Sequence, residues 1–180
     1  MAILAVNAGS STLKFSLHPV QGKQVAPSVL TGSIQGLEPQ GTPEISWREQ
    51  GALMKQALPQ GPGDAFDCAL QALRNLLARL PNLPSLQAVA HRVVHGGAHY
   101  TCSVRVTPQV LHDLAQLNSL APLHQPHNLA GIEAFAQAFP HLPQIACFDT
   151  AFHTTVPPKE QQFALPRALT QQGVRRYGFH

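Results

Sequence analysis

The feature that most constrains the fold is a strand–turn–strand pattern at the start of the sequence. Residues 2–6 form a short apolar run with β-branched members, and residues 13–17 alternate between apolar and polar side chains. The spacer at residues 8–11 contains one Gly and two Ser, which are common in turns. Two strand patterns joined by a tight turn are typical of a β-hairpin. The chain is therefore expected to open with two antiparallel strands, against which later elements have to pack.

Strand and helix patterns then alternate along the chain. A third strand is predicted at residues 29–34, and residues 35–63 indicate loops and edge structure around a short strand. Asp64 and Thr107 each precede apolar positions at helical spacing and are suitable N-caps. The predicted helices span residues 65–80, 108–120 and 128–138, and the predicted buried strands span residues 88–94 and 145–148. This order predicts an α/β fold in which helices flank a mixed sheet.

The composition argues against nucleic-acid and membrane partners. The formal net charge is +3, and the 12 Lys and Arg residues are scattered rather than gathered in a basic patch. No segment approaches the roughly 20 consecutive apolar residues that a membrane helix needs. Cys68, Cys102 and Cys147 are widely spaced and form no CxxC pair, which is typical of reduced thiols. We therefore expect a cytoplasmic protein that binds neither nucleic acid nor a membrane.

The turn of the predicted hairpin has features of a phosphate site. Gly9 allows backbone N–H groups to approach a ligand closely, and the neighbouring Ser and Thr hydroxyls can donate hydrogen bonds. Asn7 could add an amide and Lys14 a positive charge. The stretch has one glycine and leads into a strand, so it does not match the Walker loop, in which GxxxxGK[ST] precedes a helix. From spacing alone, a plain hairpin turn and a phosphate-binding hairpin both remain open.

Two charged residues lie at the ends of predicted buried strands. Arg92 precedes a Gly-Gly break, and its guanidinium could bind a carboxylate bidentately or pair with a structural Asp. Asp149 directly follows the strand at residues 145–148, at the carboxyl end where sites in open α/β sheets lie. A carboxylate in that position requires a metal or a hydrogen-bond network. Each residue alone is compatible with a structural role as well as a functional one.

The remaining polar motifs are weaker when each is taken alone. His124 and His127 lie in the proline-bounded segment APLHQPHNL, which predicts a loop, where histidines are more often solvated than catalytic. Phe179 and His180 end the sequence in RRYGFH, without a polar tail. Because a natural terminus usually ends in solvated residues, this ending favours a truncated sequence.

Five segments together resemble the amino-terminal half of the acetate kinase family, within the acetate and sugar kinase, heat-shock protein and actin superfamily. In order, they are NAGSSTLKF, HRVVHGG, APLHQPHNL, FDTAFH and RRYGFH, and they span nearly the whole chain. The resemblance implies a ribonuclease H-like, actin-like ATPase lobe at residues 1–149. Residues 150–180 would begin a second lobe, most of which is missing.

The resemblance also implies roles for individual residues. The residues expected near the metal and the nucleotide phosphates are Asn7, for the metal, and Lys14, Ser10 and Thr12. The residues expected around the substrate are Arg92, at its carboxylate, and Val94, Leu123 and Phe179, at its methyl group. The residues expected to act in catalysis are Asp149, His124 and His180, the last on the transferring phosphoryl group.

The implied reaction is the reversible transfer of the ATP γ-phosphoryl group to acetate, giving acetyl phosphate and ADP with Mg²⁺ or Mn²⁺. A carboxylic acid has a pKa of about 4, so the nucleophile is already ionised at neutral pH and needs no general base. We therefore expect Asp149 to organise Mg²⁺ or its waters, although the family resemblance implies an acid or base there.

Three points stay open at this level. Propionate or another short-chain carboxylate is an alternative substrate, because an apolar pocket discriminates one methylene by only ~1–3 kcal/mol. The family completes its cleft with later segments, so this chain alone is expected to be inactive, and a non-catalytic lobe that binds an anion or a partner is the other alternative. The full-length family forms homodimers through its carboxy-terminal domain, which leaves the oligomeric state of this chain undetermined.

Overall fold

The computed structural model describes residues 1–49, 51–59 and 64–177. The strands in this part of the chain are β1 (Ala2–Ala8), β2 (Thr12–Gln21), β3 (Gln24–Val25), β4 (Leu30–Gln35), β5 (Glu44–Glu49), β6 (Ala52–Ala57), β7 (Leu86–Val93), β8 (Val104–Arg105) and β9 (Gln144–Phe148). The α-helices are α1 (Ala65–Arg79), α2 (Pro108–Ala115), α3 (Gln125–Ala138) and α4 (Arg167–Gln171). Two 3-10 helices, η1 (Asn118–Leu120) and η2 (Asp149–His153), complete the set.

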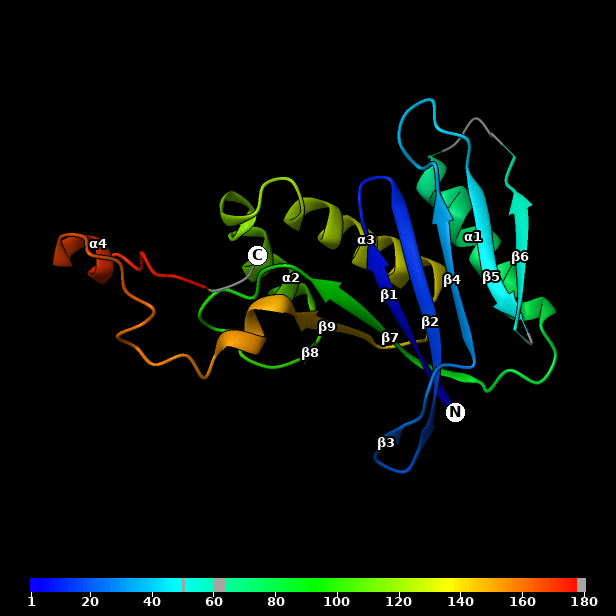
Figure 1. The fold of residues 1–180 in the computed structure, drawn as a ribbon, viewed down its shortest axis with the longest axis horizontal. Coiled ribbons are helices and arrows are strands. Elements are labelled where there is room, and N and C mark those ends of the chain that lie inside the picture. Colours follow the sequence, from blue (N-terminus) through cyan, green and yellow to red (C-terminus); the bar gives the residue numbers. More distant parts are fainter. Residues whose placement is uncertain (50, 60–63, 178–180) are drawn as a thin grey trace.

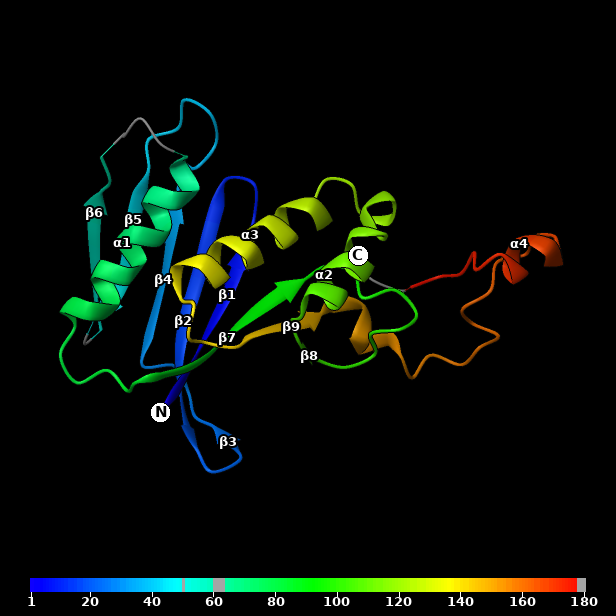
Figure 2. The same cartoon turned by 180° about the vertical axis from the view of Figure 1, so that it is seen from behind.

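The described strands form one mixed nine-stranded sheet. Its order is β6-β5-β4-β2-β1-β7-β9-β8, and β3 pairs with β2 beside this path. Figures 1 and 2 show α1, α2 and α3 on one face of the sheet. The predicted α/β fold, a mixed sheet flanked by helices, is thus confirmed.

Antiparallel strands make one half of the sheet, and parallel pairs lie at its centre. β1 and β2 pair antiparallel over the whole of β1, and the Gly9 N–H closes the turn by donating to the Thr12 carbonyl (2.8 Å). The predicted hairpin is therefore present. β1 pairs parallel with β7, and β7 pairs parallel with β9. The carboxyl ends of these three strands consequently lie at the same edge of the sheet.

The two faces of the sheet differ because burial alternates along the strands. The buried positions of the hairpin are Ala2, Leu4, Val6 and Ala8 on β1 and Leu13, Phe15 and Leu17 on β2. They share one apolar core with Leu70 and Leu73 of α1 and with Phe135 of α3. Successive side chains of a strand point to opposite faces, so the intervening positions, such as Asn7 and Lys14, face away from the helices. On the hairpin, that open face carries Ala5, Asn7, Lys14 and Ser16 together with Ile3.

The start of α3 differs from the prediction. The helix begins at Gln125 rather than at Asn128, so His127 lies in its first turn and not in a loop. The prediction treated Pro126 as a loop signal. Proline is in fact well suited to the first turn of a helix, because the N–H that it lacks would have no intrahelical partner there.

Other short elements also differ from the predicted ones. The helix predicted at residues 108–120 ends at Ala115, and η1 follows, because Asn118 and Ser119 favour turns over helix interiors. β6 was not predicted, since all six of its residues are exposed and show no alternation of burial. β8 and α4 span only two and five residues, too few for a periodic pattern to appear.

The last described segment extends away from the sheet. After η2 the chain forms an arm that carries α4 (Figure 1), and the end of the described arm contacts the segment that follows β7. The Tyr177 ring lies 4.4 Å from the ring of His95, measured between centroids. Across the described ranges, no helix combines the length and apolar character that crossing a membrane would require.

Candidate functional site

An open groove of about 410 Å³ lies on the sheet face that the helices leave uncovered. It crosses the carboxyl ends of β1, β7 and β9 and the part of β2 that pairs with the end of β1. The groove is lined by Ala5, Val6, Asn7, Lys14, Phe15, Ser16, Ala90, His91, Arg92, Cys147, Phe148 and Asp149. Four of the predicted site residues, Asn7, Lys14, Arg92 and Asp149, therefore meet in one place, although up to 142 positions separate them in the sequence.

The hairpin brings an amide and a cation to one side of the groove. Asn7 and Lys14 are directly opposite each other in the β1–β2 register, so their side chains emerge on the same face. Asn7 is half-buried and Lys14 is exposed. No described carboxylate forms an ion pair with Lys14, which leaves its ammonium group available to an anionic ligand.

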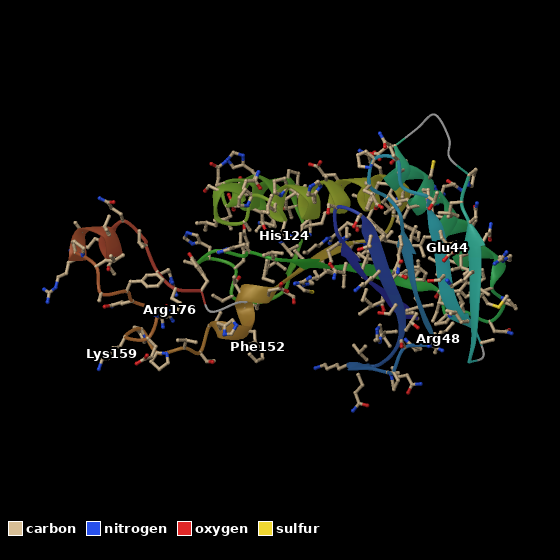
Figure 3. All side chains as sticks on the ribbon, turned by 45° about the horizontal axis from the view of Figure 1, so that its top comes forward. Glu44, Arg48, His124, Phe152, Lys159 and Arg176 are labelled. Atoms are coloured by element: carbon tan, nitrogen blue, oxygen red, sulfur yellow. The ribbon has the colours of Figure 1, made fainter. Side chains whose placement is uncertain are left out.

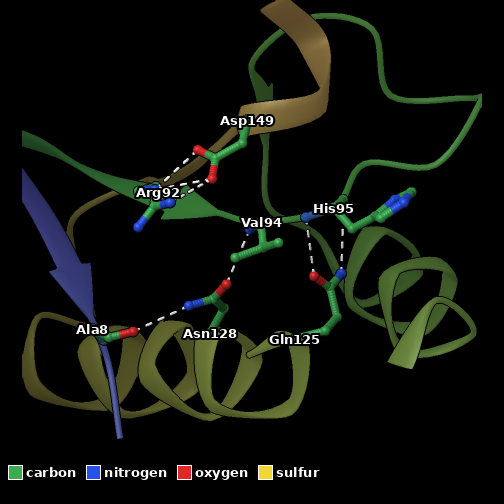
Figure 4. A network of polar contacts seen from close by, with 7 residues as sticks. All are labelled: Ala8, Arg92, Val94, His95, Gln125, Asn128 and Asp149. Atoms are coloured by element: carbon green, nitrogen blue, oxygen red, sulfur yellow. Dashed lines mark hydrogen bonds and ion pairs between the residues drawn. The ribbon is translucent and has the colours of Figure 1, made fainter. Parts of the chain in front are cut away.

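Arg92 and Asp149 form an ion pair on the other side of the groove. Arg92 Nε donates to both carboxylate oxygens at 3.0 Å, and Nη2 donates to Oδ2 at 2.6 Å. The hydrogen bond to Asp149 raises the pKa of Arg92 above its ordinary value. Figure 4 shows that the remaining guanidinium nitrogen points away from Asp149. The Arg–Asp pairing considered from the sequence is thus present, and part of the guanidinium stays free for a second partner.

The other predicted site residues within the described ranges do not line this groove. Ser10 is exposed in the hairpin turn, and Thr12 is half-buried at the start of β2. His124 is exposed at the N-cap position of α3 and makes no capping hydrogen bond through its side chain (Figure 3). Val94 is 4% exposed and Leu123 is 77% exposed, and neither side chain lines the groove. Phe179 and His180 lie outside the described residues.

Two buried amides behind the groove were missed by sequence reasoning (Figure 4). Asn128 accepts from the Val94 N–H (3.0 Å) and donates to the Ala8 carbonyl (3.1 Å). Gln125 binds the backbone of His95 twice, accepting from its N–H (3.2 Å) and donating to its carbonyl (2.9 Å). Both amides stand in the APLHQPHNL segment. A helix start placed at Gln125 would have put them three residues apart on one helix face, pointing to a buried pair.

The oxygen ligands in the groove suit a metal ion that is also bound by phosphate oxygens of a substrate. Within the described ranges, no three His, Cys, Asp or Glu residues lie close enough to bind a metal together. The groove does contain the carboxylate of Asp149 and the amide oxygen of Asn7. Mg²⁺ is commonly bound by one or two carboxylates together with substrate phosphates and waters, rather than by an all-protein cage. The groove therefore fits a metal–nucleotide complex better than an isolated ion.

Comparison with known proteins identifies a family. The model of the acetokinase family matches residues 2–180. The chain is 44% identical over 179 residues to the acetate kinase of Rhodopseudomonas palustris, covering 99% of this chain and 44% of that protein. It is 43% identical over 184 residues to the acetate kinase of Deinococcus radiodurans, covering 100% of this chain and 44% of that protein. The chain thus spans less than half the length of these curated relatives.

Solved structures of similar sequence share the fold. A propionate kinase from Francisella tularensis superposes with a TM-score of 0.87 at 33% identity, over 99% of this chain and 45% of that one. The acetate kinase of Porphyromonas gingivalis superposes with a TM-score of 0.84 at 30% identity, over the same shares of the two chains.

Proposed function

The chain belongs to the acetokinase family, and from that premise we propose that it supplies the amino-terminal half of the active site of an ATP-dependent acetate kinase. The complete site transfers the γ-phosphoryl group of ATP to acetate and yields acetyl phosphate and ADP, reversibly. One observation carries this proposal: Asn7, Lys14, Arg92 and Asp149, from separate segments, line a single groove.

Arg92 is the proposed partner of the acetate carboxylate. Asp149 fixes the orientation of the guanidinium through Nε and Nη2. The free edge of the group is therefore preorganised to bind a second carboxylate. Acetate is ionised at neutral pH and attacks the γ-phosphorus directly, and the bond from the γ-phosphorus to the leaving oxygen of ADP breaks. No general base is required, which agrees with an Asp149 that is occupied by a guanidinium.

Lys14 and Asn7 are the proposed partners of the nucleotide phosphates. Phosphoryl transfer depends mainly on positioning and on offsetting negative charge, and Lys14 contributes a full positive charge at the groove wall. Asn7 and Asp149 would hold Mg²⁺ or Mn²⁺, which supplies further positive charge to the phosphate oxygens when it is bound. Ser10 and Thr12 add hydroxyl groups at the hairpin turn.

The remaining roles rest on the family resemblance. We assign His124 and His180 to the transferring phosphoryl group, and Val94, Leu123 and Phe179 to the substrate methyl group. We also propose residues 1–149 as the first lobe and residues 150–180 as the start of the second, since β9, the last strand of the sheet along the described chain, ends at Phe148. A cytoplasmic location and a homodimer of the complete protein follow from the same resemblance.

Propionate is the second candidate substrate. One similar solved structure is a propionate kinase, and Leu123, proposed for the substrate methyl group, is 77% exposed in this chain. The preference between the two acids would then depend on contacts supplied by the rest of the complete protein.

A chimera tests the proposal directly. The chain is fused to the portion of the Rhodopseudomonas palustris acetate kinase that it does not match, and acyl phosphate is measured with Mg-ATP and either acetate or propionate. We expect carboxylate-dependent turnover by the chimera and none by residues 1–180 alone. A folded chimera that forms no acyl phosphate from either acid would contradict the proposal. Turnover by the chain alone would contradict the claim that it is half of a site.

A further inference from the structure

We propose that Asn128 is a positioning residue that holds the phosphate side and the carboxylate side of the groove at a fixed separation. The two sides here are the hairpin end around Asn7 and Lys14, and the end of β7 that carries Arg92. The inference rests on the proposed function, because it assigns a catalytic consequence to a link between the two proposed half-sites.

The backbone pairing between the two sides stops at the level of the site. The parallel register of β1 with β7 ends at Val6↔His91, one residue before Asn7 and Arg92. Each side continues with its outer partner, since β1 pairs with β2 up to Ala8 and β7 pairs with β9 up to Val93. The sheet therefore divides at this edge into two separate ribbons, and the groove lies across their ends.

Asn128 bridges the two ribbons beyond the last backbone pair (Figure 4). Its amide nitrogen donates to the Ala8 carbonyl, next to Asn7, and its amide oxygen accepts from the Val94 N–H, two residues after Arg92. The side chain is 7% exposed, so water does not readily replace either bond. One rigid amide thus sets the spacing between a residue of each half-site.

Gln125 provides a matched control on the same helix. It is also a buried amide with hydrogen bonds to backbone groups, but its partners are His95 and Leu114. None of these bonds reaches the hairpin, so Gln125 fastens α3 to the β7 side only. Replacing it removes a comparable amount of buried hydrogen bonding and leaves the bridge between the two sides intact.

The consequence is a specific kinetic signature. Arg92 and Lys14 each stay on their own side when the bridge is lost, so their contacts to acetate and to the nucleotide phosphates persist, whereas the metal proposed between Asn7 and Asp149 spans the two sides. The two bound ligands, however, no longer hold the reacting atoms at a fixed distance, and a misplacement of about 1 Å can cost roughly 100-fold in rate. Loss of the bridge should therefore lower kcat while leaving the KM for acetate nearly unchanged.

The first experiment compares two variants in the chimera described above. We expect Asn128→Ala to lower kcat by about 100-fold, with the KM for acetate within about threefold of the parent. Gln125→Ala should lower stability to a similar extent and keep kcat within about threefold. Equal kcat values for the two variants, measured at equal folded fractions, would overturn the proposal.

A conservative variant separates positioning from folding. Asn128→Asp keeps an acceptor for the Val94 N–H but has no donor for the Ala8 carbonyl while its carboxyl group is ionised. We expect low kcat at neutral pH and a partial recovery relative to the parent as the pH falls, because the protonated carboxyl donates again. If the ratio of the Asn128→Asp kcat to the parent kcat did not change with pH, that result would contradict the role of the hydrogen bond to the Ala8 carbonyl.

Hydrogen exchange of residues 1–180 gives a readout that is independent of activity. Asn128→Ala should speed exchange of the Val94 amide and also of the Gly9 amide in the hairpin turn, whereas Gln125→Ala should leave Gly9 unchanged. An unchanged Gly9 rate in Asn128→Ala would overturn the bridge even if the chimera proved inactive. An inactive chimera with the expected exchange pattern would instead count against the proposed function alone.

Discussion

At the residue scale, Arg92 shows how one guanidinium can serve two carboxylates. Asp149 occupies its Nε and one of its terminal nitrogens, which fixes the plane of the group without exhausting its donors. A lysine at this position would carry the charge but could not be held by one carboxylate while presenting a planar edge to another. The ion pair therefore fits a binding residue whose orientation is set before the substrate arrives.

His91 leads to a prediction about pH and stability. The ring is buried, its Nε2 lies 2.7 Å from the Gln144 amide oxygen, and burial lowers the pKa of His91 to about 4. The unfolded chain, in which the pKa is near 6.5, therefore binds a proton at a higher pH than the folded chain does. The contribution of neutral His91 to the free energy of unfolding should be fully present above about pH 6.5. It should decrease as the pH drops toward 4 and stay at a constant, lower value below that pH.

Urea unfolding at two pH values checks this prediction. The contribution of His91 between about pH 7.5 and about pH 5 should be a loss of about 2 kcal/mol. His91→Leu should be less stable than the parent at both pH values, because it leaves the Gln144 oxygen unpaired. The stability that the variant loses between the two pH values, however, should be smaller than the parent's loss by about 2 kcal/mol. If parent and variant lost the same stability on acidification, His91 would not be the titrating group.

At the element scale, the sequence was informative where a pattern was long and periodic. The apolar run of β1, the apolar–polar alternation of β2 and the capped, amphipathic α1 were all predictable, because burial in the core dictates these patterns. β6 was not, since an edge strand exposed along its whole length has no buried face to constrain it. The start of α3 was misplaced because Pro126 was treated as a loop signal rather than as a first-turn residue.

The same contrast applies to the candidate site. Asn7, Lys14, Arg92 and Asp149 could be singled out because polar groups stood out at the ends of strand patterns. A helix start at Gln125 would have indicated Asn128 and Gln125 as a buried pair, but their roles depend on backbone groups that are distant in sequence, such as the Ala8 carbonyl 120 positions away. Such contacts become visible only once the packing of α3 is known.

The contact between α3 and β1 gives an element-scale prediction. A Cβ added at Gly131 would lie 2.9 Å from the Ala8 Cβ, so the glycine lets the helix approach the end of β1 closely. Gly131→Ala gains about 1 kcal/mol of helix propensity but overpacks the contact at a cost of ~1–3 kcal/mol. We expect a net loss of about 1 kcal/mol in the free energy of unfolding, measured by urea denaturation.

A double variant provides the control for this contact. Ala8→Gly removes the opposing methyl group, so Gly131→Ala should become stabilising in that background, and the two substitutions should show a favourable coupling energy. Strict additivity of the two effects, or a Gly131→Ala variant more stable than the parent, would show that α3 is not constrained by this close approach.

At the scale of the whole molecule, one face of the sheet packs against helices and the other face carries the groove. The helices cover the first face, and the uncovered face brings together the hairpin, β7 and β9 (Figures 1 and 2). The chain spans 44% of the length of the acetate kinase relatives compared here, so the groove is proposed as one wall of a larger cleft. Its cationic residues would then supply one side of the charge that phosphoryl transfer requires.

The measurement that tests this account most directly is the dependence of acyl phosphate formation on acetate concentration in the chimera carrying Arg92→Ala. Lys55→Ala is the matched control, because Lys55 is a cation at the far edge of the sheet, 3.2 Å from Glu44 and outside the groove. We predict that Arg92→Ala raises the KM for acetate about 10- to 100-fold, as expected for the loss of charge-assisted hydrogen bonds, and that Lys55→Ala leaves it unchanged. An acetate KM in Arg92→Ala equal to that of the Lys55 control would contradict the assignment of this groove as the carboxylate site.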